Sequence, residues 1–186
     1  MKGMRGLTLM IGTLVLAGTT ALQAQHEPMV GGQAMYPSKD IIDNAVNSAD
    51  HTTLVAAVKA AGLVETLKGK GPFTVFAPTN GAFKLLPDGT VETLLKPENK
   101  GMLTSVLTYH VVPGRYDAKA LLDLIHKGRG QATLKTVNGA TLSLMMNGDR
   151  NIVVKDAKGD VANIAVYDVY QSNGVILVID RVLLPA

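Results

Sequence analysis

The stretch Gly-Pro-Phe-Thr-Val-Phe-Ala-Pro-Thr-Asn-Gly-Ala-Phe, residues 71–83, decides the fold class of this chain. Its residues 73–76 form a short run of aromatic and β-branched side chains, which is typical of a buried strand. Pro78 removes a backbone donor and favours extended geometry in the residue before it, so we expect the strand to end there. Thr79 is a good N-cap for a helix whose apolar face begins at Ala82. The stretch therefore predicts a rigid corner from strand to helix in the middle of the fold.

The chain on either side of this corner changes from helical to strand periodicity. Ser38, Asp50 and Asp117 each precede a segment with apolar residues at helical spacing, and we expect each of them to cap a helix. In the second half the period becomes two, and Asn138-Gly139 between two such runs is a strong hairpin signal. Helices followed by hairpins indicate an α+β fold and not alternating βαβ units. We therefore predict one α+β domain over residues 38–186, with a helical first half packed on a twisted β-structure from the second half.

The first 24 residues have the layout of a secretory signal peptide. Two basic residues precede a short apolar run at 7–17, and small residues then lead to a cleavage site that we expect after Ala24, with Ala21 as the second candidate. The apolar run is too short for a comfortable membrane span, so stable membrane insertion is not expected. Residues 25–37 contain Gly, Pro and Met without a period and predict a flexible N-terminal arm. The predicted localisation is secreted or periplasmic.

Composition and motifs exclude several classes of protein. The chain has no cysteine, so disulfides and a lipoprotein anchor are excluded and stability must come from packing. The net charge of +3 falls to +1 once Lys2 and Arg5 leave with the signal peptide, and no basic stripe remains, so no nucleic acid partner is expected. Ser105 and Ser143 lack a nucleophile elbow, and neither a nucleotide-binding loop nor a zinc-spaced His pair occurs. We predict no enzyme, no cofactor and no metal, although paired acids that meet only in space stay open.

Three segments in the chain resemble one known family. They are residues 73–83, residues 107–114 with the sequence Leu-Thr-Tyr-His-Val-Val-Pro-Gly, and residues 172–185 with the sequence Ser-Asn-Gly-Val-Ile-Leu-Val-Ile-Asp-Arg-Val-Leu-Leu-Pro. Their order and spacing resemble the first conserved box, the Tyr-His segment and the second box of fasciclin domains, and the similarity covers nearly all of 38–185. The resemblance implies a wedge-like α+β fold. It also implies cell adhesion, matrix or biofilm association, or host contact.

The resemblance further implies a binding site. Adhesion by animal members is attributed to an Asp-Ile pair before the second box and to the Tyr-His segment, which correspond here to Asp168-Val169 and Tyr109-His110. Tyr167 and Tyr170 around the first pair are unlike the animal integrin-binding sequence. Asn80 stands where Asp is common in the first box. Together with that box, the predicted binding residues are Thr79, Asn80, Tyr109, His110, Asp168 and Val169.

The histidines and the Asp-Val pair each allow a structural interpretation. His110 is either a ligand-contacting, pH-sensitive group or, as we favour, a half-buried residue that is hydrogen-bonded to backbone at a helix end. His51 and His126, near a helix start and a helix end, are expected to face solvent or the helix dipole. Strand alternation predicts that Val169 is buried and Asp168 exposed.

Two functions follow as expectations. The first is a secreted, non-catalytic binding protein that contacts a surface protein or glycan, with self-association as a homodimer as one route to adhesion. The alternative, which the resemblance to fasciclin domains implies, is an extracellular carrier of a small hydrophobic ligand such as a carotenoid or lipid. Met side chains would suit it because they adapt to irregular apolar ligands. The residues expected to form that soft apolar surface are Met102, Met145, Met146, Leu142 and Leu144.

Overall fold

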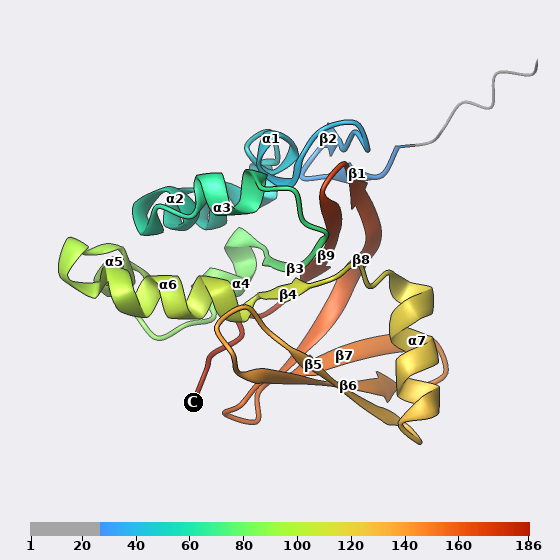
Figure 1. Cartoon of the computed structure of the whole chain (residues 1–186). Coiled ribbons are helices and arrows are strands. Elements are labelled where there is room, and N and C mark those ends of the chain that lie inside the picture. Colours follow the sequence, from blue (N-terminus) through green and yellow to red (C-terminus); the bar gives the residue numbers. More distant parts are fainter. Residues whose placement is uncertain (1–26) are drawn as a thin grey trace, which may run out of the picture.

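A computed structural model describes residues 27–186, so the predicted signal peptide lies outside the described residues. A group of helices lies on one side of a β-structure, and one further helix, α7, packs against the strands at the other end (Figure 1). The helices are α1 (Ile41–Ala45), α2 (Thr52–Ala61), α3 (Val64–Lys68), α4 (Asn80–Lys84), α5 (Thr90–Leu95), α6 (Lys100–Tyr109) and α7 (Ala118–Lys127), with short 3₁₀ turns at Ala49–His51 and Pro97–Asn99. None of the helices in this described part is long and apolar enough to cross a membrane.

Seven strands form one sheet in the order β4-β3-β9-β8-β7-β6-β5. They are β3 (Phe73–Pro78), β4 (Val111–Pro113), β5 (Gln131–Lys135), β6 (Thr141–Asn147), β7 (Asn151–Lys155), β8 (Val161–Gln171) and β9 (Gly174–Ile179). β3 and β9 are parallel, and the other neighbours are antiparallel. The amide of Val137, just after β5, donates to the carbonyl of Val111 in β4 at 2.8 Å, which brings the two sheet edges together. The result is a strongly twisted, mostly closed sheet, and the predicted α+β class is confirmed.

The strand-to-helix corner predicted from residues 71–83 is present. β3 lies between β4 and β9, and the side chain of Phe76 is fully buried. The strand ends at Pro78, and the hydroxyl oxygen of Thr79 accepts the amide of Ala82 at 3.2 Å, which caps α4. The corner therefore joins the central strand directly to the helical side of the molecule.

The buried apolar side chains divide into two cores. One lies between α1–α6 and the face of β3, β4 and β9 that the helices cover. The other lies inside the curved sheet and is closed by α7, whose Leu121 and Ile125 are fully buried. Phe76 and Tyr109 belong to this second core, so β3 and the end of α6 contribute to both sides of the sheet.

Two of the four predicted helix caps differ in the structure. Asp117 caps α7 as expected, through the amide of Ala120 at 2.9 Å. The cap of α1 is Asp40 and not Ser38, because the Asp40 carboxylate reaches the amide of Asp43 at 2.8 Å. Asp50 lies in a 3₁₀ turn before α2, and the amide of Thr53 at the start of α2 instead donates to Asn80 from a different helix. Sequence patterns report local caps and cannot report a cap supplied by another element.

The segment predicted as a flexible arm is packed over most of its length. Residues 29–34 form a small hairpin of β1 (Met29–Val30) and β2 (Gln33–Ala34). Val30 and Met35 are buried in the helical-side core, and the amide of Ala49 donates to Gly31 O. The prediction is corrected because two apolar anchors, spaced too widely to give a period, hold the segment against α1 and the following turn.

Candidate ligand-binding site

Thr79 and Asn80, predicted to bind a partner, make bonds inside the fold. Beyond the capping bond of Thr79, the Asn80 amide oxygen accepts the backbone amide of Thr53 at 3.0 Å and the hydroxyl of Thr52 at 3.2 Å. Its amide nitrogen donates to the carbonyl of Ala49 at 2.9 Å. Asn80 thereby supplies the N-terminal cap of α2, whose own N-cap residue makes none.

Tyr109 lies at the end of α6 with its ring in the second core. Its hydroxyl donates to the carbonyl of Thr141 at 2.9 Å and accepts the amide of Ala157 at 2.9 Å. Burial raises the pKa of this phenol. Tyr109 therefore joins the end of α6 to the strands and does not present a free hydroxyl to a partner.

His110 is buried and uses both ring nitrogens. Nδ1 lies 2.8 Å from the carbonyl of Val106, and Nε2 lies 2.9 Å from the amide nitrogen of Leu183. A backbone amide can only donate, so Nε2 accepts and Nδ1 carries the proton that is donated to Val106. Desolvation lowers the pKa of His110 to about 4, which keeps the ring neutral near pH 7. The backbone-bonded interpretation of His110 is confirmed, and its burial is more complete than expected.

Asp168 and Val169 lie in an irregular part of β8. Val169 is buried, as predicted, while Asp168 is half-buried and not fully exposed. Asp168 has a φ of 56°, and its carboxylate accepts the amide of Ala118 at 2.7 Å. With Asp117 it satisfies the first turn of α7, where negative charge is favoured.

The six predicted residues therefore form three separate structural junctions. Thr79 and Asn80 join α4 to α2, Tyr109 and His110 join α6 to the strands and the C-terminal segment, and Asp168 joins β8 to α7. A binding role for these side chains stays a prediction, but each polar side chain among them already makes at least one hydrogen bond within the described fold.

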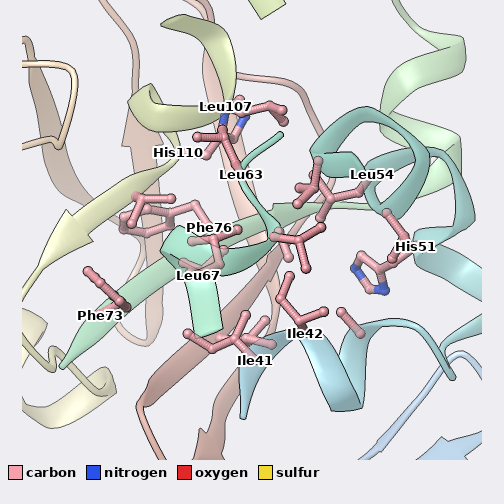
Figure 2. Close-up of a pocket in the computed structure, with 18 of the residues that line it drawn as sticks. Ile41, Ile42, His51, Leu54, Leu63, Leu67, Phe73, Phe76, Leu107 and His110 are labelled. Carbon is pink, nitrogen blue, oxygen red and sulfur yellow. The ribbon is translucent and has the colours of Figure 1, made fainter. Parts of the chain in front are cut away.

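An apolar cavity of about 80 Å³ lies between the helices and the sheet. Figure 2 shows side chains of α1, α2 and α3 meeting there, with Phe73 and Phe76 of β3 and Leu107 of α6. The cavity exists because three short helices pack their apolar faces on the sheet without filling the space among them. The apolar side chains contributed by the helices and the adjoining loop include Ile41, Ile42, Leu54, Leu63, Leu67 and Leu107.

Partly exposed residues also line this cavity. Ala45 of α1, Val55 of α2 and Val64 of α3 are half-buried, and Lys59 of α2 is exposed. The cavity thus extends toward the surface between these helices. α1 and α3 border the cavity and have five residues each, so they are short elements that can open locally.

His51 is buried against the same cavity, contrary to the expectation that it faces solvent (Figure 2). Its Nδ1 lies 2.8 Å from the hydroxyl of Ser48, and its Nε2 has no hydrogen-bond partner. Desolvation lowers the pKa of His51. At helical spacing, residue 51 falls on the same face as the apolar residues 54, 55 and 58 of α2. This apolar face was the sequence signal that could have predicted the burial of His51.

The methionine-rich surface predicted for a lipophilic ligand is not part of the cavity. Met102 is 60% exposed on α6, and Met145 and Met146 lie on β6 at a different part of the fold. Leu142 and Leu144 point into the second core and are fully buried. The hydrophobic space of this protein is lined by branched aliphatic side chains from the helices.

Side chains suited to metal binding do not gather in the structure. Among residues 27–186, no group of three or more His, Asp or Glu side chains is placed to hold a metal ion.

Comparison with known proteins decides the family. The family model of the fasciclin domain matches residues 49–185. The chain belongs to the fasciclin family. Its similar relatives include the fasciclin protein sll1483 of Synechocystis, which is 42% identical over 97% of this chain and 91% of that protein. Cell surface glycolipoprotein MPB83 of Mycobacterium bovis is 33% identical over 92% of this chain and 72% of its own length.

A solved structure also matches the fold. The FAS1 domain pair from the insect cell adhesion molecule Fasciclin I superposes with a TM-score of 0.70 at 20% identity. The match covers 78% of this chain and 51% of that chain, which contains two domains. The predicted fasciclin fold is therefore confirmed, and the family includes adhesion and cell-surface proteins.

Proposed function

We propose that this fasciclin protein is exported and works by binding, without catalysis, and that it takes a small hydrophobic ligand into the cavity between α1–α3 and the sheet. The observation that carries this proposal is the near-wholly apolar cavity beside two five-residue helices. The predicted adhesion residues, in contrast, already use their polar groups inside the fold. Binding sites for small molecules are usually concave and apolar with few polar groups.

The volume limits what the cavity can hold. A cavity of about 150 Å³ lined by aliphatic and aromatic side chains holds benzene, and the cavity here measures about 80 Å³. It accommodates about three to four carbon atoms as it stands. The ligand is therefore a compact molecule or one end of a lipid chain, and a longer ligand requires α1 and α3 to move away from the sheet.

The first experiment is native mass spectrometry of the protein purified from its own source, together with an absorbance spectrum. Retained mass of lipid-like or coloured character supports the carrier function. The ligand is then extracted and rebound to Ala45→Leu, which adds bulk at the half-buried α1 side of the cavity. We expect at least tenfold weaker rebinding to this variant. Ala60→Leu, on the exposed face of α2, is the matched control and should bind as the wild type does.

If Ala45→Leu and Ala60→Leu bind the extracted ligand equally well, the cavity is not the site. A clean mass from freshly purified protein that also fails to bind short alkanes would overturn the carrier function altogether.

Adhesion is the second candidate, because one similar structure belongs to a named cell adhesion molecule and one similar relative to a named cell surface glycolipoprotein. Three apolar side chains, Met29, Tyr36 and Val46, are exposed in the hairpin, the following loop and the end of α1. A surface protein, a glycan or a second copy of the chain could contact this part of the molecule. Adhesion to cells by ligand-free protein, lost in Met29→Ser/Val46→Ser, would support this candidate. A clean dimer mass would point to self-association.

A further inference from the structure

We infer that the ligand of this cavity carries a neutral oxygen acceptor, such as a carbonyl, ester or ether, which receives a hydrogen bond from the Nε2–H of His51. The inference rests on the proposed function and names the chemical class of its ligand. It depends on the geometry of one buried histidine and its surroundings.

The contact with Ser48 fixes which ring nitrogen of His51 carries the proton. Ser48 is buried, and within residues 27–186 its hydroxyl has one side-chain partner, the Nδ1 of His51 at 2.8 Å. A buried hydroxyl proton needs an acceptor, and Nδ1 is the acceptor within reach. Ser48 therefore donates to Nδ1. In the neutral ring the proton then lies on Nε2, which becomes a donor.

This donor has no satisfactory partner in the described fold. The backbone of Ala77 partly opposes the lowering of the His51 pKa, but Nε2 forms no hydrogen bond with it. Among the buried side-chain nitrogens and oxygens of residues 27–186, Nε2 of His51 is the one left without a partner. A buried donor without an acceptor is costly, so a ligand that supplies one gains affinity.

The other buried and half-buried polar side chains that line the cavity are already engaged, while Lys59 and Thr66, which also line it, are exposed. Both nitrogens of His110 are bonded to backbone, and the hydroxyl of Thr108 donates to the carbonyl of Thr104 at 2.7 Å. A water molecule at Nε2 would need further polar partners that this apolar lining scarcely offers. The arrangement therefore favours an apolar molecule with a single acceptor over a polar ligand.

The charge state of His51 selects a neutral acceptor. Desolvation lowers the pKa of His51, so the ring is neutral near pH 7, although the Asp50 carboxylate partly opposes this effect. A carboxylate ligand would bring an unpaired charge into an apolar space, which is strongly unfavourable. A carbonyl or ether oxygen meets the donor without that cost.

The test compares two probes of matched size and shape that the cavity can hold as it stands, acetone and 2-methylpropane, on the full chain. Dissociation constants are measured by ¹H–¹⁵N NMR for the wild type, His51→Leu and His126→Leu. Comparing both probes in each variant and in the wild type removes the effects of the changed cavity shape and of the greater hydrophobicity of the alkane, as in a double-mutant cycle. We expect the ratio of the ketone constant to the alkane constant to rise about tenfold in His51→Leu. It should stay unchanged in His126→Leu, where the replaced histidine is exposed.

The outcomes separate this inference from the proposed function. If both probes bind and the ratio is the same in all three proteins, the cavity binds ligands but His51 does not select them, and the inference is wrong. If neither probe binds the wild type, the proposed function fails with it. Should His51→Leu not fold, the Nε2–H resonance of wild-type His51 is observed instead. Acetone should shift this resonance and 2-methylpropane should not, and equal behaviour of the two probes would overturn the inference.

Discussion

The Nε2 of His110 accepts a hydrogen bond from the backbone amide of Leu183 at 2.9 Å. The next amide, that of Leu184, donates to the carboxylate of Asp156 at 2.9 Å, so two consecutive amides fasten the C-terminal segment. The hydroxyl of Tyr109 accepts the amide of Ala157, beside Asp156. These hydrogen bonds thus connect the Tyr-His segment with the β7–β8 turn and with the end of the second box.

Replacing His110 should therefore cost stability. His110→Leu removes the bond to the carbonyl of Val106 and leaves the amide of Leu183 buried without an acceptor. We expect a loss of about 2–4 kcal/mol in the free energy of unfolding, measured by urea titration near pH 7. The exposed control His126→Leu should stay within about 0.5 kcal/mol of the wild type. A similarly small loss in His110→Leu would show that the bond to Leu183 contributes little.

The same residue predicts how stability depends on pH. The pKa of His110 is about 4 in the fold, against 6.5 for an unperturbed histidine, so between these values the unfolded chain binds more protons than the folded one. The contribution is fully present above about pH 6.5 and is lost as the pH falls toward 4, by about 3 kcal/mol in all. The lowered pKa of His51 acts in the same direction.

Urea titrations at several pH values between 7 and 4.5 measure this dependence. The wild type should lose stability more steeply than His110→Leu, so the difference between the two proteins should shrink as the pH falls. Parallel curves would mean that His110 does not keep a lowered pKa in the fold.

Asp168 should behave as a helix cap and not as a contact residue. Asp168→Ala loses the bond to the amide of Ala118 and places a Cβ-bearing residue without a local hydrogen bond at a φ of 56°. We expect a loss of about 2 kcal/mol in stability, while Asp168→Asn, which keeps an acceptor and tolerates this φ, should lose less than about 1 kcal/mol. Circular dichroism with urea titration measures both. If folded Asp168→Ala instead loses adhesion to cells at unchanged stability, the residue is a contact group after all.

The sequence was sufficient to predict the central corner and the fold class. Pro78 and Thr79 set the end of β3 and the start of α4 by local chemistry, and the turn at Asn138-Gly139 does the same for the β5–β6 hairpin. These features depend on neighbours in the chain, which a sequence shows directly.

The cavity could not be predicted in the same way. The cavity is the space that α1, α2 and α3 leave unfilled when they pack on the sheet. That packing depends on residues distant in the chain, such as Asn80, which caps α2. The sequence alone does not show whether a polar residue in one of the family boxes contacts a ligand or caps a helix from another element. Helical spacing does contain the apolar lining residues of α1 and α2 and the burial of His51.

Asn173 links the two short helices beside the cavity, α1 and α3, to the β8–β9 turn. Its amide oxygen accepts the amide of Ile41 at 3.1 Å, and its amide nitrogen donates to the carbonyls of Leu67 at 2.7 Å and Gly69 at 2.9 Å. One side chain in the β8–β9 turn thus fastens the start of α1 and the end of α3, the two short helices beside the cavity. Asn173→Ala should lose about 2–4 kcal/mol in the free energy of unfolding, because three buried or half-buried backbone groups lose their partner.

The variant should also open locally. We expect hydrogen exchange in α1 and α3 of Asn173→Ala to accelerate more than exchange in β3 and β9, and any bound ligand to dissociate faster. Asn147→Ala, at the exposed end of β6, is the matched control and should leave both unchanged. Uniform acceleration across helices and strands would mean that Asn173 stabilises the whole domain and does not separately hold the cavity closed.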